Sequence, residues 1–98
     1  LVGSEMCIET VKKAHEVTEL TDENLDDVTT PGTYHQNMVV RAKLELNYPE
    51  PKAAGLLEVW NPDARMVYQR FTIFWSGDMY YRGSYDKKWK PWKKILTE

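Results

Sequence analysis

Hydrophobic and polar residues alternate in the C-terminal part of the chain, most clearly between residues 66 and 75. One set of alternate positions holds Val67, Gln69, Phe71, Ile73 and Trp75. The other set holds Met66, Tyr68, Arg70, Thr72 and Phe74. A period of two is typical of a β-strand, and apolar residues on both faces indicate a strand with neighbours on either side. This segment is therefore predicted to be a central strand.

Further short strands are predicted before and after this segment, separated by turn residues. They cover residues 33–37, 38–46, 55–60, 79–85 and 89–95. Pro31 and Gly32 form a turn signal, residues 47–51 and 61–63 contain prolines that interrupt pairing, and residues 76–78 (SGD) predict a hairpin turn. The order of these elements predicts a meander of mostly antiparallel strands.

The N-terminal residues follow a different pattern, which predicts a helix from residue 4 to about residue 20. Ser4 is a suitable N-cap, and no Gly or Pro interrupts the segment. Ile8, Val11 and His15 lie on one thin stripe of this helix. Such a stripe needs neighbours, which are either the body of the domain or copies of the helix itself.

The segment at residues 21–30 is acidic and rich in turn-forming residues. It is predicted to be a connection, with Leu25 and Val28 turned inward. The expected fold class is α+β, an N-terminal helix followed by a small, mostly antiparallel β-sheet. The expected division places the helix and an acidic linker at residues 1–24 and the β domain at residues 25–98.

Composition and charge limit the class of protein. The chain has 98 residues, 42% hydrophobic and 29% charged, which suits one folded domain. Residues 1–30 hold eight acids and two lysines, whereas residues 31–98 hold eleven bases and seven acids. A globally basic nucleic-acid binder is not indicated, and no apolar run is long enough to span a bilayer. The sequence shows no signal-peptide pattern. The chain begins at Leu1 rather than Met, which predicts an excised fragment or a processed product.

No group of residues in the sequence indicates catalysis, a metal or a cofactor. Cys7 is the only cysteine, and no His–Asp arrangement beside it indicates a nucleophile. His15 and His35 are far apart in sequence and lack Cys or carboxylate residues at metal-ligand spacing. We therefore expect a protein that is not an enzyme, with no catalytic residues, no metal and no cofactor.

The segment at residues 85–95 (YDKKWKPWKKI) carries five lysines and two tryptophans and allows two interpretations. It is either a basic, aromatic patch that binds nucleic acid or membrane, or the last strand of the sheet. In a regular strand, Trp89 and Trp92 would point to opposite faces and could not form one platform for stacking bases. Pro91 indicates an edge strand or a bulge, and lysines protect such an edge from unwanted pairing. We favour a closing edge strand, with no nucleic-acid partner and no membrane insertion.

Several short motifs follow one another in a characteristic order between residues 25 and 95. They are LDD at 25–27, TPG at 30–32 followed by Tyr34, NYP at 47–49, an apolar strand that opens with Gly55, an aromatic hairpin at 72–85, and Trp89 with Trp92. Together they resemble the pyocin-knob family, small domains in the tail fibres of tailed phages and of R-type pyocins. The residues that carry this structural signature are Pro31, Gly32, Tyr34, Tyr48, Pro49, Gly55, Trp89 and Trp92.

The resemblance implies a structural and adhesive module of a tail fibre. Such a module spaces the receptor-binding end of the fibre, or presents it to the bacterial surface, during host attachment. The resemblance also implies a homotrimer in the parent fibre and a place in the virion tail fibre after assembly in the host cytoplasm. Bacterial surface polysaccharide or lipopolysaccharide is the candidate external partner.

The aromatic hairpin is the candidate ligand site, because exposed Trp and Tyr rings can stack on the apolar faces of sugars. In this alternative the domain itself binds host glycan as a lectin does, through the hairpin from residue 75 to residue 81. The candidate contacts are Trp75, Asp78, Tyr80, Tyr81 and Arg82. In the competing interpretation, which we favour, the aromatic residues of the hairpin build the sheet core and contacts between subunits.

Overall fold

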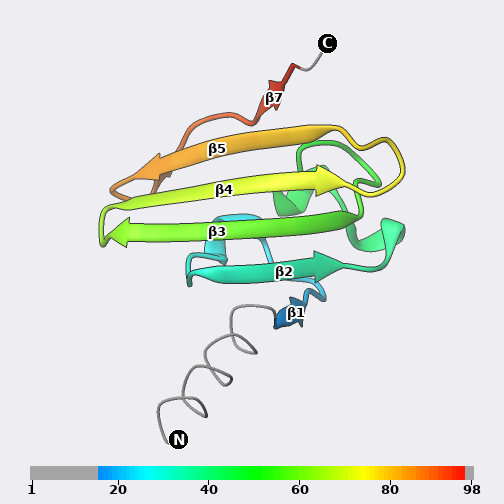
Figure 1. Cartoon of the computed structure of the whole chain (residues 1–98), viewed down its shortest axis with the longest axis horizontal. Coiled ribbons are helices and arrows are strands. Elements are labelled where there is room, and N and C mark those ends of the chain that lie inside the picture. Colours follow the sequence, from blue (N-terminus) through cyan, green and yellow to red (C-terminus); the bar gives the residue numbers. More distant parts are fainter. Residues whose placement is uncertain (1–15, 97–98) are drawn as a thin grey trace, which may run out of the picture.

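Four antiparallel strands form the centre of the sheet in the computed structural model, which describes residues 16–96 (Figure 1). They are β2 (Gly32–Gln36), β3 (Gly55–Asp63), β4 (Met66–Ile73) and β5 (Met79–Tyr85), and each pairs with the next along the chain. The central position predicted for residues 66–75 is confirmed, because β4 lies between β3 and β5.

Shorter strands complete the two edges of the sheet. At one edge, β1 (Val17–Glu19) runs parallel to β2. At the other, β6 (Lys88–Trp89) and β7 (Lys93–Ile95) both pair antiparallel with β5. The predicted closing edge strand is confirmed in position, but residues 90–92 lie outside both short strands. Pro91 explains this interruption, because proline has no N–H to donate to a ladder.

The expected α+β class is wrong for the residues that the structure describes. Among residues 16–96, helical structure is limited to three 3₁₀ turns, η1 (Leu25–Asp27), η2 (Val39–Arg41) and η3 (Leu44–Leu46). The predicted helix covered residues 4–20; residues 4–15 lie outside the described residues, and the part that is described contains strand β1 instead. Two of the three residues of β1 are β-branched, and pairing with β2 supplies hydrogen-bond partners for its backbone.

The described sheet and its core include residues before position 25. β1 pairs with β2, and Leu20 directly after it is 4% exposed and belongs to the core. Residues 1–15 lie outside the described residues. The division between residues 1–24 and 25–98 therefore stays a prediction.

The strand predicted at residues 38–46 is also wrong, since this segment forms η2 and η3. The reason is that β2 already has β1 and β3 as neighbours, so the segment that follows it cannot pair beside it. The Gln36 side chain accepts a hydrogen bond of 2.9 Å from the backbone N–H of Met38. Asn47 then ends η3 in the left-handed conformation, with φ of 63°.

The hydrophobic core lies on one face of the sheet, beneath the irregular connections. β3 and β4 contribute Leu57, Val59, Phe71 and Ile73, all nearly inaccessible to solvent. The connections cover them with Leu20, Leu25, Val28, Ala42, Tyr48 and Ala53. The predicted inward position of Leu25 and Val28 is confirmed. Burial of these apolar side chains is the main contribution to stability.

Two tyrosines of the predicted signature fasten the connections to this core. The Tyr34 hydroxyl donates to the backbone oxygen of Thr30 at 2.6 Å, which closes the turn before β2. The hydroxyl of Tyr48, which is 2% exposed, accepts a hydrogen bond of 3.1 Å from Gln36 Nε2. Burial raises the pKa of both tyrosines above the ordinary value. Both hydroxyls are therefore protonated at neutral pH and serve as structural hydrogen-bonding groups.

Gly55 is required by a close approach between the backbones of β3 and β4. A Cβ atom at this position would lie 2.0 Å from the carbonyl oxygen of Thr72. We expect Gly55→Ala to lower the free energy of unfolding by about 3 kcal/mol or more, because the two strands must separate locally. Urea unfolding followed by circular dichroism measures the change. Gly83→Ala is the control, since its Cβ would meet no atom closer than 3.8 Å; equal losses in the two variants would contradict the steric explanation.

Candidate functional site

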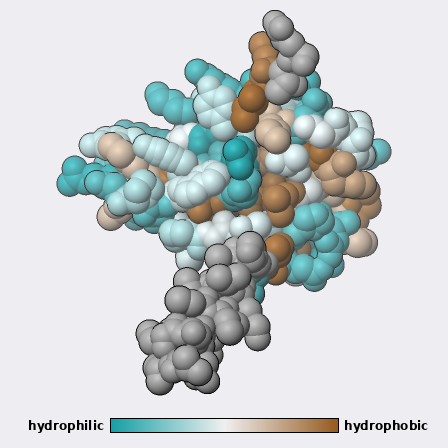
Figure 2. Space-filling view, in the orientation of Figure 1, coloured by the Kyte–Doolittle hydropathy of each residue, from teal (hydrophilic) through white to brown (hydrophobic). Residues whose placement is uncertain are grey.

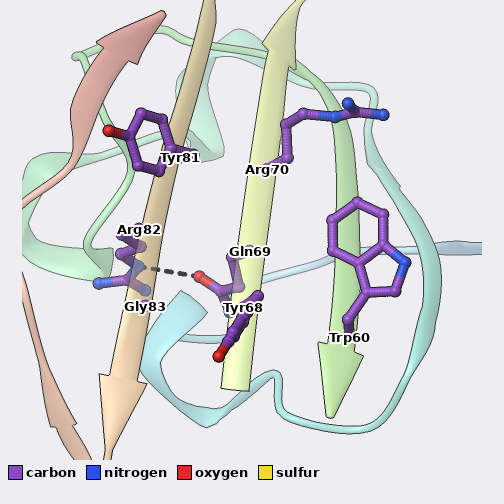
Figure 3. Close-up of a pocket in the computed structure, with 7 residues that line it drawn as sticks. All are labelled: Trp60, Tyr68, Gln69, Arg70, Tyr81, Arg82 and Gly83. Carbon is purple, nitrogen blue, oxygen red and sulfur yellow. Dashed lines mark hydrogen bonds between the residues drawn. The ribbon is translucent and has the colours of Figure 1, made fainter. Parts of the chain in front are cut away.

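The face of the sheet opposite the core is open to solvent and carries the candidate site. Strand pairing places Trp60 opposite Tyr68, and Tyr68 opposite Gly83, in one cross-strand row. Arg70 and Tyr81 face each other in the next row. These residues alternate with buried ones along their strands, so their side chains leave the sheet on the other side. Figure 3 shows them around a shallow depression.

Three aromatic rings and an arginine line this depression, which has a volume of about 340 Å³. Trp60, Tyr68 and Tyr81 are each between 41% and 47% exposed. The Arg70 guanidinium carbon lies 5.5 Å from the centroid of the Trp60 ring. Its Nη2 is 2.8 Å from Glu58 Oε1, an ion pair that orients the arginine. The depression therefore combines large apolar rings with one oriented cation.

A second depression adjoins the first toward the edge of the sheet. It has a volume of about 380 Å³ and is lined by Tyr81, Gly83, Lys90, Pro91 and Lys93, together with Arg82. The two hollows share the strip of β5 at residues 81–83, where Gly83 has no side chain to separate them. The two lysines are exposed and bring positive charge to this end. Aromatic side chains can stack on a sugar ring, and neighbouring cations favour a sugar that carries acidic groups.

The structure spreads the five predicted glycan contacts over different parts of the surface and interior. Trp75 lies in the turn between β4 and β5 and is 61% exposed. Tyr81 lies on the open face, beside the depression. Asp78 is paired with Lys94, with Nζ and Oδ2 3.3 Å apart. Tyr80 and Arg82 alternate with Tyr81 and point to the core side. A glycan site made by all five together stays a prediction. Two of the five, Tyr81 and Arg82, are among the residues that line the depression, and of these two only Tyr81 is exposed on the open face.

Tyr80 already has a partner within the fold. Its hydroxyl donates a hydrogen bond to the Glu50 carboxylate. This hydrogen bond, with a smaller contribution from burial, raises the pKa of Tyr80 to about 12. Tyr80 therefore ties β5 to the connection before β3.

Arg82 is the centre of a buried cluster on the core side of the sheet. Its guanidinium carbon lies 4.0 Å from the ring centroid of Trp89 and 4.5 Å from that of Trp92, so the cation contacts both indole rings. Its Nη1 is 2.8 Å from Asp26 Oδ1, and its Nε donates to Gln69 Oε1 at 2.9 Å. Burial lowers the pKa of Arg82, and the hydrogen bond and charge of Asp26 oppose that shift. An arginine stays charged at any physiological pH, so this cation is held by its partners.

Both tryptophans of the closing segment contact Arg82, whereas a regular strand would place them on opposite faces. The interruption at Pro91 between β6 and β7 accounts for the difference. Trp89 Nε1 donates to the backbone oxygen of Asp26 at 3.2 Å, and Trp92 Nε1 donates to that of Asn47 at 2.7 Å. The two indole rings of this segment therefore make contacts within the fold, and its lysines remain at the surface.

The sequence pattern did not single out Trp60, Tyr68 or Arg70 as site residues. The available signal was the alternation along residues 66–75, which places positions 68 and 70 on one face. Their partners on β3 and β5 depend on strand register, which the sequence does not reveal.

Within residues 16–96, no three His, Cys, Asp or Glu side chains come together in a way that could hold a metal ion. Over the same residues, no helix has the length and apolar character needed to cross a membrane.

The fold has relatives among solved structures. No protein-family model matches the sequence, and no curated protein matches it. The structure is similar to an N-truncated R2-type pyocin tail fibre, with a TM-score of 0.72 and 29% identity over 82% of this chain and 32% of that one. It is also similar to the C-terminal part of a P. aeruginosa R1 pyocin fibre, with a TM-score of 0.71 and 26% identity over 83% and 21%. An Acinetobacter phage tailspike shares the fold at 16% identity, with a TM-score of 0.70 over 85% and 16%.

These similarities relate the fold of this chain to domains of R-type pyocin tail fibres. The resemblance to the knob domains of R-type pyocin fibres, expected from the motifs at residues 25–95, is confirmed by the R2 and R1 structures. The chain spans about a third or less of the length of those fibres. The similarity therefore concerns one module of a longer assembly.

The buried cluster around Arg82 predicts a clear cost for a conservative change. We expect Arg82→Lys to lower the free energy of unfolding by about 2 kcal/mol, because a lysine keeps the charge but cannot stack on two rings and bond to Gln69 at once. Near-ultraviolet circular dichroism should lose intensity from the tryptophans. Arg65→Lys, at an exposed position, should change stability by less than about 0.5 kcal/mol. Similar small effects from both variants would show that the stacking contributes little.

Proposed function

We propose that this chain is a non-enzymatic structural module of the tail fibre of a phage or of a phage-tail-like particle. It spaces the receptor-binding end of the fibre, or presents it to the bacterial surface. The observation that carries this proposal is the similarity to the R2-type pyocin tail fibre over 82% of the chain at 29% identity. The same similarity supports a place in the tail of the particle as part of this proposal.

The use of polar groups in the described residues supports a structural role. The buried Arg82 has Asp26 and Gln69 as partners, and Gln69 Nε2 also donates to the backbone oxygens of Leu25 and Val28 at 2.7 and 2.9 Å. These buried polar side chains hold a connection against the sheet. Groups committed to such contacts contribute to a fixed shape, which a spacer in a fibre requires.

Self-association into a homotrimer is part of this proposal and can be tested directly. We expect the mass of the 98-residue chain in solution to approach three times 11.5 kDa as its concentration rises. Light scattering across a concentration series measures this mass. A monomer at every concentration would contradict self-association by this chain.

Saccharide binding is the second candidate function, and a particular observation favours it. The open face presents Trp60, Tyr68 and Tyr81 around a depression, with Lys90 and Lys93 beside it. Aromatic rings of this kind stack on sugar faces, and the lysines would suit a glycan that carries carboxylate or phosphate groups. The site proposed from the sequence lay in the hairpin from Trp75 to Tyr81, so the two locations share one residue.

Alanine substitutions separate the two locations. If the open face binds glycan, Trp60→Ala and Tyr81→Ala should each weaken binding to an array of bacterial surface polysaccharides by about tenfold or more, because each removes a stacking ring. Trp75→Ala should then leave binding unchanged. Because Tyr81 belongs to both locations, Trp60 and Trp75 are the residues that separate them: loss of binding in Trp75→Ala but not in Trp60→Ala would favour the hairpin tip. No binding by the wild-type chain would contradict the saccharide-binding function and leave only the structural one. Unchanged thermal unfolding of each variant is the control for folding.

A further inference from the structure

The two edges of the sheet carry opposite charge. Around β1, at one edge, the exposed acids are Glu16, Glu19, Asp22 and Glu23. Around β6 and β7, at the other edge, the exposed bases are Lys87, Lys88, Lys90 and Lys93. Four strands separate these edges in the sheet order, β2 to β5. Figure 1 shows β1 and β7 on opposite sides of the central strands.

These charges are not used in ion pairs within the part of the chain that the structure describes. The ion pairs among residues 16–96 join Arg70 to Glu58, Arg82 to Asp26, and Lys94 to Asp78. None of them includes one of the four acids or the four lysines. The side chain of Glu19 accepts a hydrogen bond from Asn37, and Glu23 accepts from Thr21, but neither contact neutralises the charge.

Each edge also exposes an apolar side chain beside its charges. Val17 on β1 is 50% exposed, and Leu96 directly after β7 is 87% exposed. The outer sides of β1 and β7 have no strand beside them in the described sheet. Charge of one sign therefore predominates around each of these apolar side chains, although exposed Asp86 lies beside the lysines and Arg41 is close enough to Glu23 to act on its charge. A charged rim around an apolar centre is the ordinary pattern of a protein interface.

We propose that the β1 edge of one copy of this chain docks on the β6–β7 edge of the next copy. The occupant of each edge is a second copy, because the complementary charge is present on the chain itself. Contact between two different surfaces of identical subunits is heterologous and closes into a ring when the rotation between subunits allows it. A two-fold contact between like edges would instead bring acid against acid or lysine against lysine. This inference rests on the self-association in the proposed function and adds the surface responsible for it.

Exchange of charge between the edges tests this interface. The basic edge is reversed by Lys88→Glu with Lys93→Glu, and the acidic edge by Glu16→Lys with Asp22→Lys. We expect either pair of changes alone to raise the dissociation constant of the assembly at least tenfold, because like charges then meet. The variant with all four changes should recover the wild-type mass, since attraction returns with exchanged signs. Sedimentation velocity of the full 98-residue chain measures each case.

Matched controls separate the interface from general charge effects. Lys43→Glu with Lys52→Glu changes the net charge by the same amount at exposed positions outside β1, β6 and β7, and should leave the assembly intact. Raising the salt concentration should weaken the wild-type assembly, because screening shortens the range of exposed charges. Association that survives both single-edge reversals, or that the fourfold variant fails to restore, would overturn this interface but not the proposed trimer. A wild-type chain that stays monomeric at low salt would overturn both.

Discussion

The rest of the structure depends on the contacts made by the buried guanidinium group of Arg82. It joins β5 to the closing segment through the two indole rings and to the first connection through Asp26. The tryptophans in turn donate to backbone oxygens of Asp26 and Asn47, in two different connections. A cation enclosed in this way is stable only while all its partners are in place. The small sheet thereby obtains a fixed arrangement of connections that apolar burial alone would leave less specific.

The sheet divides its residues between two tasks. One face builds the core with the connections, whereas the opposite face keeps Trp60, Tyr68 and Tyr81 in contact with solvent. Figure 2 shows hydrophobic and hydrophilic residues side by side on the molecular surface, in the orientation of Figure 1. The closing segment follows the same division, with Trp89 and Trp92 inward and its lysines outward. Basic residues near aromatic ones in a sequence therefore need not make one binding patch.

Much of the sheet could be predicted from the sequence, and the errors have physical causes. Strong alternation and clear turn residues located β3, β4 and β5, because local pattern determines which face of a strand is buried. The strand prediction for residues 38–46 is wrong because their local pattern suits a strand, whereas both sides of β2 are already paired with β1 and β3. The predicted helix failed at β1 because a thin apolar stripe does not fix a helix against competing strand pairing. The aromatic depression depends on register between three strands, which no local pattern contains.

The position of β1 and β7 at opposite edges has a mechanical consequence. A pull applied between residue 16 and residue 96 passes across the strands, along the direction of their hydrogen bonds. When the force acts along the hydrogen bonds between two strands, these bonds break one after another rather than together. The edge strand with the fewest contacts therefore separates first. β1 is joined through only three residue pairs, while the opposite edge is reinforced by the tryptophans around Arg82. Under load, β1 would peel away while the central strands kept their shape, and the domain would lengthen before it lost its core.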